Sequence, residues 1–122
     1  MLTRSRHVIA VGDLERSAAF YRDVLGFEVQ WQDVAGWRQF VRDGCLVMAG
    51  ECADAVPAGD TGDHSYFAYV DVTGVDALHA DLRDRGAEMI KPLRDEPWGM
   101  REFGLRTIDG HRMMFGEPLP AT

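Results

Sequence analysis

The stretch WGMREFGLRTIDGHRMMFGE, residues 98–117, decides the fold of this chain. Residues 102–106 have the pattern of an extended strand, Asp109-Gly110 supplies a tight turn, and residues 112–115 have the pattern of a returning strand. Asp-Gly pairs are favoured in hairpin turns because both positions tolerate a positive φ. The stretch therefore predicts an antiparallel β-hairpin.

An earlier stretch repeats this hairpin. Residues 40–51 read FVRDGCLVMAGE, with a strand, an Asp-Gly turn, a four-residue strand and a final Gly-Glu in the same order. Asp43 and Glu51 each lie 66 residues before their counterparts Asp109 and Glu117. A fixed separation between corresponding residues indicates an internal repeat. The chain is therefore predicted to contain two copies of one unit.

Length and composition limit the classes of protein. A chain of 122 residues with 46% hydrophobic content fits one domain, 1–122, in which two units share a core. The net charge of −7 and the pI of 4.9 argue against a nucleic-acid or anionic-membrane partner, and they fit a cationic small molecule or simple solubility. The absence of a long apolar run and of a signal-peptide pattern leads us to expect a cytoplasmic protein. Cys45 and Cys52 have neither metal-site nor disulfide spacing, so free thiols are expected.

The first unit, residues 1–51, has the pattern β-α-β-β-β. Asp13 is a suitable helix N-cap, and Gly26 ends the helix. The apolar residues of this helix recur with helical spacing at Leu14, Ala18, Tyr21 and Leu25. Strands are expected at residues 4–11, 27–32, 37–42 and 45–49.

The second unit, residues 64–122, follows a linker over residues 52–63 that is rich in Ala, Gly, Asp and Pro. Thr73 is expected to cap its helix and Gly86 to end it. Strands are expected at residues 65–72, at 87–90 and in the hairpin, with a loop over 91–99. The whole chain therefore predicts an α+β fold of two tandem β-α-β-β-β units.

The motifs of this chain resemble those of a known superfamily. Residues 11–27 fit V-x-D-L-x-x-S-x-x-F-Y-x-x-V-L-G-F, and residues 109–112 read D-G-H-R. With paired β-α-β-β-β units, they resemble the vicinal oxygen chelate superfamily, which contains glyoxalase I, fosfomycin-modifying enzymes, extradiol dioxygenases and bleomycin-resistance proteins. The resemblance covers nearly the whole chain and implies a curved, barrel-like mixed sheet with the helices outside.

Two stretches look most like the bleomycin-resistance branch. They are EPWGMREFGLR at residues 96–106 and FVRDG at residues 40–44. The matching stretch of that branch reads PWGREFALRD, so Met100 is an insertion and Thr107-Ile108 replaces Asp-Pro. The resemblance implies a homodimer whose interface clefts sequester a small molecule without a cofactor. Open sheets with free edges also favour a homodimer.

Enzymes of the superfamily hold a divalent metal ion on the concave side of their sheets, and counting along the motifs locates the ligand positions in this chain. These positions hold Arg6, Met48, Phe67 and Met114. Arg and Phe offer no lone pair to a metal, and a thioether favours Cu(I) over hard divalent ions. More suitable donors occur at His7, Glu51, His64 and Glu117. Strand alternation turns His7 and Glu117 to the opposite side if no bulge intervenes, so no metal site is expected.

The same alternation predicts a ligand pocket. Its apolar lining is expected to consist of Trp37, Phe40, Met48, Phe67, Trp98 and Met114. Arg6 and Arg101 are expected to be its polar handles. Aromatic rings give contact area at little entropic cost, so we expect a planar or cationic ligand, and we favour a planar zwitterion.

Three functions remain open at this point. The first is a metal-free binding protein. The second is an enzyme, either a metal-dependent glyoxalase-like lyase, isomerase or dioxygenase, or a metal-free catalyst using Arg6, Arg101 or Glu102. The third is a homologue that binds an ordinary metabolite. The sequence shows no paired nucleophile and base and no phosphate-binding glycine motif, so we expect the binding protein.

Overall fold

The computed structural model describes the backbone of residues 1–120 and the side chains of these residues apart from 62–64. The first unit contains β1 (His7–Val11), α1 (Leu14–Asp23), β2 (Glu28–Gln30), β3 (Trp37–Arg42) and β4 (Cys45–Glu51). The second contains β5 (Tyr66–Asp71), α2 (Val75–Asp84), β6 (Glu88–Asp95), β7 (Met100–Arg106) and β8 (Arg112–Pro118). A short 3-10 helix, η1 (Ala58–Ser65), lies between them. Helices α1 and α2 have ten residues each, about half of what a membrane crossing requires.

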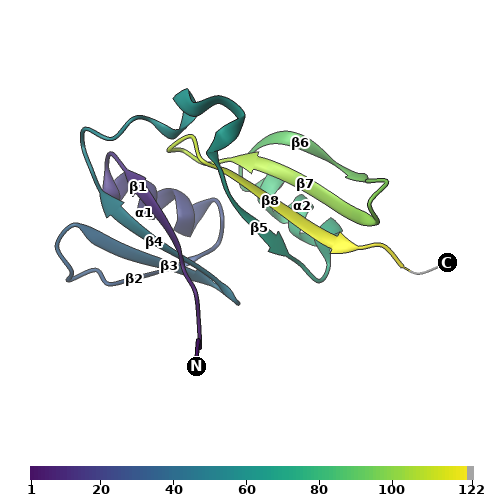
Figure 1. Ribbon diagram of the computed structural model, residues 1–122, viewed down its shortest axis with the longest axis horizontal. Coiled ribbons are helices and arrows are strands. Elements are labelled where there is room, and N and C mark those ends of the chain that lie inside the picture. The colour runs from purple at the N-terminus through teal and green to yellow at the C-terminus, as the bar shows by residue number, and fades with distance from the viewer. Residues whose placement is uncertain (121–122) are drawn as a thin grey trace.

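Each unit forms its own four-stranded mixed sheet (Figure 1). The strand orders are β1-β4-β3-β2 and β5-β8-β7-β6, and in each sheet only the first strand is parallel to its neighbour. A parallel pair requires a long crossover connection, in which α1 and α2 lie. The predicted α+β fold of two tandem β-α-β-β-β units is confirmed. The sheets are curled, but they remain two sheets instead of closing into one barrel.

A glutamate near the end of each unit accepts hydrogen bonds from amides at the N-terminus of that unit's helix. Asp13 caps α1 as predicted, and Glu51 also accepts a hydrogen bond from the Leu14 amide at 3.1 Å. The prediction of Thr73 as the cap of α2 was wrong, because the N-cap residue is Gly74 with φ 85° and no side-chain cap. Instead Glu117 accepts hydrogen bonds from the amides of residues 74 and 75 at 2.8 and 3.1 Å, and these bonds hold its pKa below the ordinary value.

The expected loop over residues 91–99 was wrong in its first half, because β6 continues to Asp95. Pro92 lies within this strand although it has no N–H to donate. The strand tolerates it because β6 is at the sheet edge and pairs with β7 through two irregularities in register. Pro92 and the bulges also protect the edge from pairing with another chain.

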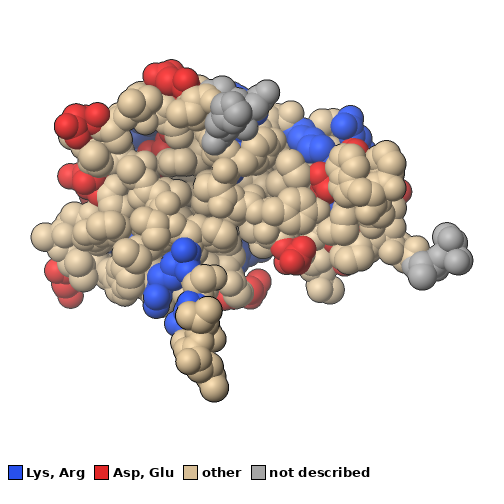
Figure 2. Space-filling view, in the orientation of Figure 1, with Lys and Arg blue, Asp and Glu red and all other residues tan. Residues whose placement is uncertain are grey.

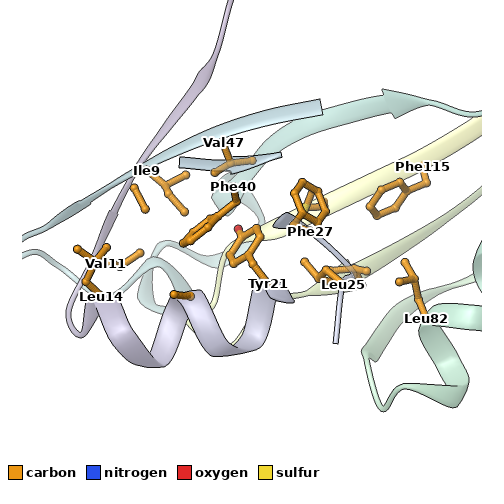
Figure 3. Close-up of a cluster of buried hydrophobic side chains, with 14 of the residues drawn as sticks. Ile9, Val11, Leu14, Tyr21, Leu25, Phe27, Phe40, Val47, Leu82 and Phe115 are labelled. Carbon is orange, nitrogen blue, oxygen red and sulfur yellow. The ribbon is translucent and has the colours of Figure 1, made fainter. Parts of the chain in front are cut away.

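One hydrophobic core serves both units. In Figure 3 the side chains of α1 meet those of the first sheet, where Tyr21 stacks on Phe40 with ring centroids 4.4 Å apart. The same cluster continues through Leu25 to Leu82 of α2 and Phe115 of β8. Fully burying such a side chain stabilises a protein by about 1.5–3 kcal/mol. Neither unit can retain this contribution without the other.

A buried polar contact also joins the units. The Ser17 hydroxyl, on α1, contacts both carboxylate oxygens of Asp109 at 2.9 and 2.8 Å. Asp109 lies in the hairpin turn of the second unit, where Gly110 packs so closely on Gly59 of η1 that a Cβ would be 2.6 Å from the Gly59 amide nitrogen. Ser17 belongs to the motif of the first helix, and Asp109 belongs to the D-G-H-R motif of the hairpin. Their hydrogen bond therefore links the first unit to the second.

Candidate functional site

Each sheet has one side covered by its helix and one open side. Phe40 and Val47 are buried under α1, so their neighbours Gln39 and Met48 lie on the other side. We call this side the first-unit face, and it carries Val8, Trp37, Gln39, Val41 and Met48. The second-unit face is the corresponding side of the other sheet, and it carries Tyr69, Lys91, Glu102, Gly104 and Met114.

Figure 1 looks onto both faces, because both helices lie behind their sheets in that view. Figure 2 shows the same side as space-filling atoms. Uncharged side chains cover most of it, and the acidic side chains lie mainly towards its margins. The two open faces are therefore surfaces with few charged side chains, on which an uncharged part of a ligand could lie.

A line of hydrogen bonds crosses the first-unit face. The Arg6 Nε donates to the Gln39 Oε1, and the Gln39 Nε2 donates to the Gln30 Oε1 at 2.7 Å. Gln39 is only 5% exposed, so burial and these hydrogen bonds hold its side chain in one position. A cavity of about 480 Å³ lies beside it, lined by Arg4, Ser5, Gln30, Gln39, Val41, Asp43, Gly44 and Leu46. This face offers amide and guanidinium groups to a ligand.

Trp37 covers the end of the first-unit face. A Cβ built on Gly50 would lie 2.8 Å from the Trp37 ring, so only glycine lets the ring lie there. The residue is 38% exposed, which leaves part of its aromatic surface open.

Glu102 is the centre of the second-unit face, with 2% of its surface exposed. Its Oε1 accepts hydrogen bonds from the Trp98 Nε1 at 2.8 Å and from the Tyr69 hydroxyl at 3.1 Å. Its Oε2 lies 3.1 Å from the Lys91 ammonium, which also lies 3.1 Å from Glu96. A single buried carboxylate therefore fixes two aromatic side chains and the ammonium group.

The protonation states of this cluster follow from its contacts. Burial by itself would raise the pKa of Glu102, but hydrogen bonds from Trp98, Lys91 and Tyr69 outweigh burial and hold the pKa below its ordinary value. Burial and the bond to Glu102 raise the pKa of Tyr69 to about 12. At neutral pH Glu102 is thus an ionised acceptor and Tyr69 a neutral donor. A carboxylate held in this way is a poor general base.

Five of the predicted site residues lie on the open faces. Arg6, Trp37 and Met48 belong to the first-unit face. Trp98 and Met114 belong to the second-unit face. The single cleft expected from the sequence is therefore divided, within one chain, between two separate sheets.

Phe40 does not share a side with Met48, contrary to the prediction. It is completely buried and stacks on Tyr21 of α1. The register of β3 and β4 sets Gln39, and not Phe40, opposite Met48. The two-residue Asp43-Gly44 turn pairs Arg42 with Cys45 and thereby fixes this register, so the turn length was a signal that the prediction did not use.

Arg101 also lies on the helix side of its sheet, so the prediction of a polar handle in the cleft is not supported. Its guanidinium pairs with Asp95 at 2.6 Å and with Asp76 of α2 at 3.1 Å. These pairs raise the pKa of Arg101 further above its ordinary value. The side chain serves as a link between β7, the end of β6 and α2.

A β-bulge turns Phe67 away from the second-unit face. Tyr66 and Ala68 pair with successive residues of β8, which leaves Phe67 as an extra residue. Its ring packs against the core and lies 5.8 Å from the ring of His7 and 5.6 Å from that of His111. Counting along an ideal strand assigns Phe67 to the face, and the bulge invalidates that count.

Besides Gly104, three residues of the second-unit face were not among the predicted site residues. Tyr69 follows Phe67 by two positions and could have been found by alternation along the strand. Glu102 was considered only as an alternative catalyst. Lys91 was assigned to a loop, although it is the only lysine among the 13 Lys and Arg residues of the chain. Being the only lysine was the one feature of the sequence that could have marked Lys91 as a candidate site residue.

The residues of the open faces do not fit a divalent metal ion. They supply the thioethers of Met48 and Met114 and the carboxylate of Glu102, whose oxygens already bind other side chains. Among the side chains that the structure describes, no group of three His, Cys, Asp or Glu residues is placed to hold a metal ion. The His64 side chain lies outside the described residues.

A further hollow of about 730 Å³ lies where the two units meet, between the β3–β4 turn, β5 and α2. Arg42, which lines it, donates to the Leu25 carbonyl oxygen at 2.7 Å and lies 3.8 Å from Asp81. These contacts give Arg42 a structural role at the junction. The open faces are therefore the stronger candidate for a functional site.

Comparison with known proteins agrees with this architecture. The profile of the Glyoxalase/Bleomycin resistance protein/Dioxygenase superfamily matches residues 4–115. The chain therefore belongs to this superfamily. No curated protein sequence matches the chain.

Several solved structures share the fold. TioX from Micromonospora sp. ML1 is 24% identical over 98% of this chain and 99% of its own, with a TM-score of 0.74. TnmS3, an antibiotic binding protein from Streptomyces sp. CB03234, is 23% identical over 97% of this chain and 98% of its own, with a TM-score of 0.69. A glyoxalase-related enzyme from Clostridium phytofermentans is 17% identical over 98% of this chain and 97% of its own, with a TM-score of 0.78. The same fold thus occurs in a binding protein and in an enzyme.

Proposed function

We propose that this protein is a metal-free small-molecule-binding protein of the bleomycin-resistance type, which sequesters a planar ligand. The observation that carries the proposal is the chemistry of the open faces. Aromatic and thioether side chains occupy them where a metalloenzyme needs His and carboxylate donors. Sequestration requires shape, stacking and hydrogen bonding, and it requires no bond-making group.

Two further observations support the binding reading over catalysis. The Glu102 carboxylate of the second-unit face is ionised and both of its oxygens have partners, so it is a poor proton acceptor. The neighbour TnmS3 is an antibiotic binding protein, and the PWG and REF segments of this chain resemble the bleomycin-resistance branch.

We further propose that the binding cleft forms between two subunits of a homodimer. Each face is one shallow wall with exposed aromatic residues, since Trp37 is 38%, Tyr69 44% and Trp98 63% exposed. A second copy that covers these faces would bury such surface and enclose a ligand. Light scattering should then give twice the chain mass of 13.6 kDa. A monomer at micromolar concentration would contradict the dimer.

Tryptophan fluorescence titration tests the location of the site. A panel of planar aromatic acids and cationic glycopeptide antibiotics should include a compound that quenches the wild-type signal. Trp98→Ala and Met114→Glu should weaken its binding by at least about tenfold, the cost of losing one stacking or apolar contact. Val56→Ala, at an exposed linker position, is the matched control and should bind normally. Equal binding by all variants would show that the second-unit face is not the site.

Elemental analysis tests the absence of metal. The purified protein should contain no stoichiometric Zn, Ni, Mn or Fe after a mild chelator wash. Retention of about one equivalent per chain, typical of a built metal site, would favour the enzyme class instead.

A further inference from the structure

Lys91 has an unusual place in this chain. It is the only lysine, and it lies on the second-unit face in the edge strand β6, beside Glu102. It pairs across the strands with Gly104, and a Cβ on that glycine would lie 3.3 Å from the Cβ of Lys91. The missing side chain of Gly104 therefore gives Lys91 room to lie across the sheet towards Glu102.

The ammonium group of Lys91 has one donor to spare. It carries three N–H groups, and two of them are directed to the carboxylates of Glu96 and Glu102, each at 3.1 Å. The third N–H has no acceptor in the part of the chain that the structure describes. The side chain remains 17% exposed, so a bound molecule can reach it.

The surroundings of this donor select the kind of acceptor. The carboxylates Glu96 and Glu102 are balanced by Lys91 and by Arg94, which binds Glu96. A full anion therefore gains little net attraction at this point. A neutral oxygen acceptor gains a charge-assisted hydrogen bond without adding charge.

Two exposed aromatic side chains flank the donor. The Lys91 Nζ lies 5.9 Å from the ring centroid of Trp98, and Glu102 fixes both Trp98 and Tyr69 by hydrogen bonds. Tyr69 lies so close over Gly116 that a Cβ there would be 2.0 Å from the hydroxyl oxygen. The rings are thus held in place before any ligand arrives, which lowers the entropic cost of stacking.

We propose that Lys91 is a ligand-binding residue, which donates its third N–H to a ring carbonyl of a planar aromatic molecule stacked on Trp98 or Tyr69. The proposal rests on the small-molecule-binding function above and names the chemical class of ligand for that site. Glu102 acts in it as a positioning residue for the donor and both rings.

A pair of probes isolates the carbonyl. The compounds 9-oxofluorene-2-carboxylate and fluorene-2-carboxylate have the same planar skeleton and charge, and they differ only in the ring ketone. Calorimetry on the wild-type protein should show about tenfold tighter binding of the ketone, the usual effect of one hydrogen bond from a charged donor. Lys91→Met should abolish this preference and leave the affinity for the hydrocarbon within about twofold. Arg94→Met removes the other cation of the cluster and should keep the preference.

A second measurement needs no variant. An amine-acetylating reagent has two targets in this chain, Lys91 and the α-amino group of Met1. The ketone at saturating concentration should slow the acetylation of Lys91 at least about fivefold, as expected for a donor buried by its ligand, and leave Met1 unchanged. Mass spectrometry of the peptides measures both rates in the same sample.

The outcomes separate this proposal from the proposed function. If both probes bind equally, with no protection of Lys91, and Trp98→Ala weakens both, the binding function stands and the role of Lys91 is overturned. A ketone preference that persists in a folded Lys91→Met protein overturns it as well. If neither probe binds the wild-type protein, planar-ligand binding at this face fails, and the inference fails with it.

Discussion

The two open faces have the same strand arrangement and opposite chemistry. In the first unit one row across the sheet consists of Val8, Met48, Gln39 and Gln30. In the second unit the corresponding row consists of Tyr69, Met114, Gly104 and Lys91. Only the methionine is common to both rows. The first row therefore offers neutral amides beside aliphatic groups, whereas the second row belongs to an ion cluster that includes two aromatic side chains as hydrogen-bond donors. The two repeated units thus share the same strand pairing, but the side chains on their open faces differ.

The largest expected difference between the faces is in stability. Glu102→Leu removes a buried carboxylate on which Lys91, Trp98 and Tyr69 depend, and it should cost about 3 kcal/mol, as expected when one member of a buried ion pair is removed. Gln39→Leu removes neutral hydrogen bonds from the first-unit face and should cost about 1 kcal/mol. Urea denaturation of both variants makes the comparison. Equal costs would mean that the ion cluster is no more important than the amide line.

A smaller difference is expected at the paired glycines Gly50 and Gly116. Gly116→Ala should displace the Tyr69 hydroxyl from Glu102 and cost about 1 kcal/mol, the value of one hydrogen bond. Gly50→Ala meets the Trp37 ring, which makes no side-chain hydrogen bond within the described part of the chain and can shift into solvent. Its cost should remain within about 0.5 kcal/mol. A larger loss in Gly50→Ala than in Gly116→Ala would contradict this ranking.

Acid should weaken the second-unit face selectively. The pKa of Glu102 is lower in the folded protein than in the unfolded chain, so its ionised form stabilises fully above the unfolded pKa of about 4.3. This contribution is lost as the pH falls through the lower folded pKa. The free energy of unfolding should therefore decline from about pH 5 downward, and less steeply in Glu102→Gln. Gln39→Leu should keep the wild-type slope, because the amide does not titrate. A Glu102→Gln slope equal to that of wild type would rule out the contribution of Glu102.

The smallest effect is expected at Arg101. Its partners Asp95 and Asp76 are exposed, and exposed ion pairs contribute little to stability. Arg101→Ala should therefore leave the melting temperature and the ligand affinity nearly unchanged. Arg6→Ala is the matched comparison, because Arg6 belongs to an open face and should alter ligand affinity more. The original prediction of Arg101 as a binding residue would be restored if its removal weakened binding as much as the removal of Arg6.

The elements and their order could be predicted from the sequence because local signals dominate there. Asp13 before an amphipathic run, and Asp109-Gly110 between two apolar runs, are sufficient to indicate a helix start and a hairpin. The prediction that Thr73 caps α2 was wrong because the amides at the start of α2 bind Glu117, which lies more than 40 residues further along the chain. Such a partner has no local signal.

The composition of the faces was less predictable because it depends on register and on bulges. Trp37, Met48 and Met114 were assigned to the open side correctly. Phe40 was misassigned because the register that the two-residue Asp43-Gly44 turn imposes was not used, and Phe67 was misassigned because of a bulge. The donors that gather around Glu102 come from two strands, β5 and β6, and from the turn that holds Trp98, and no spacing in the sequence reveals them.

The shared core has a consequence for the continuity of the chain. Leu25 on one side and Leu82 with Phe115 on the other are nearly fully buried against each other's units. Two separately synthesised halves would each expose this surface and would recognise each other as obligate partners. The peptide connection through residues 52–57 then acts as a tether that raises the effective concentration of one half near the other. Nicking the tether should leave an intact complex of two fragments, so the protein is a natural candidate for fragment complementation.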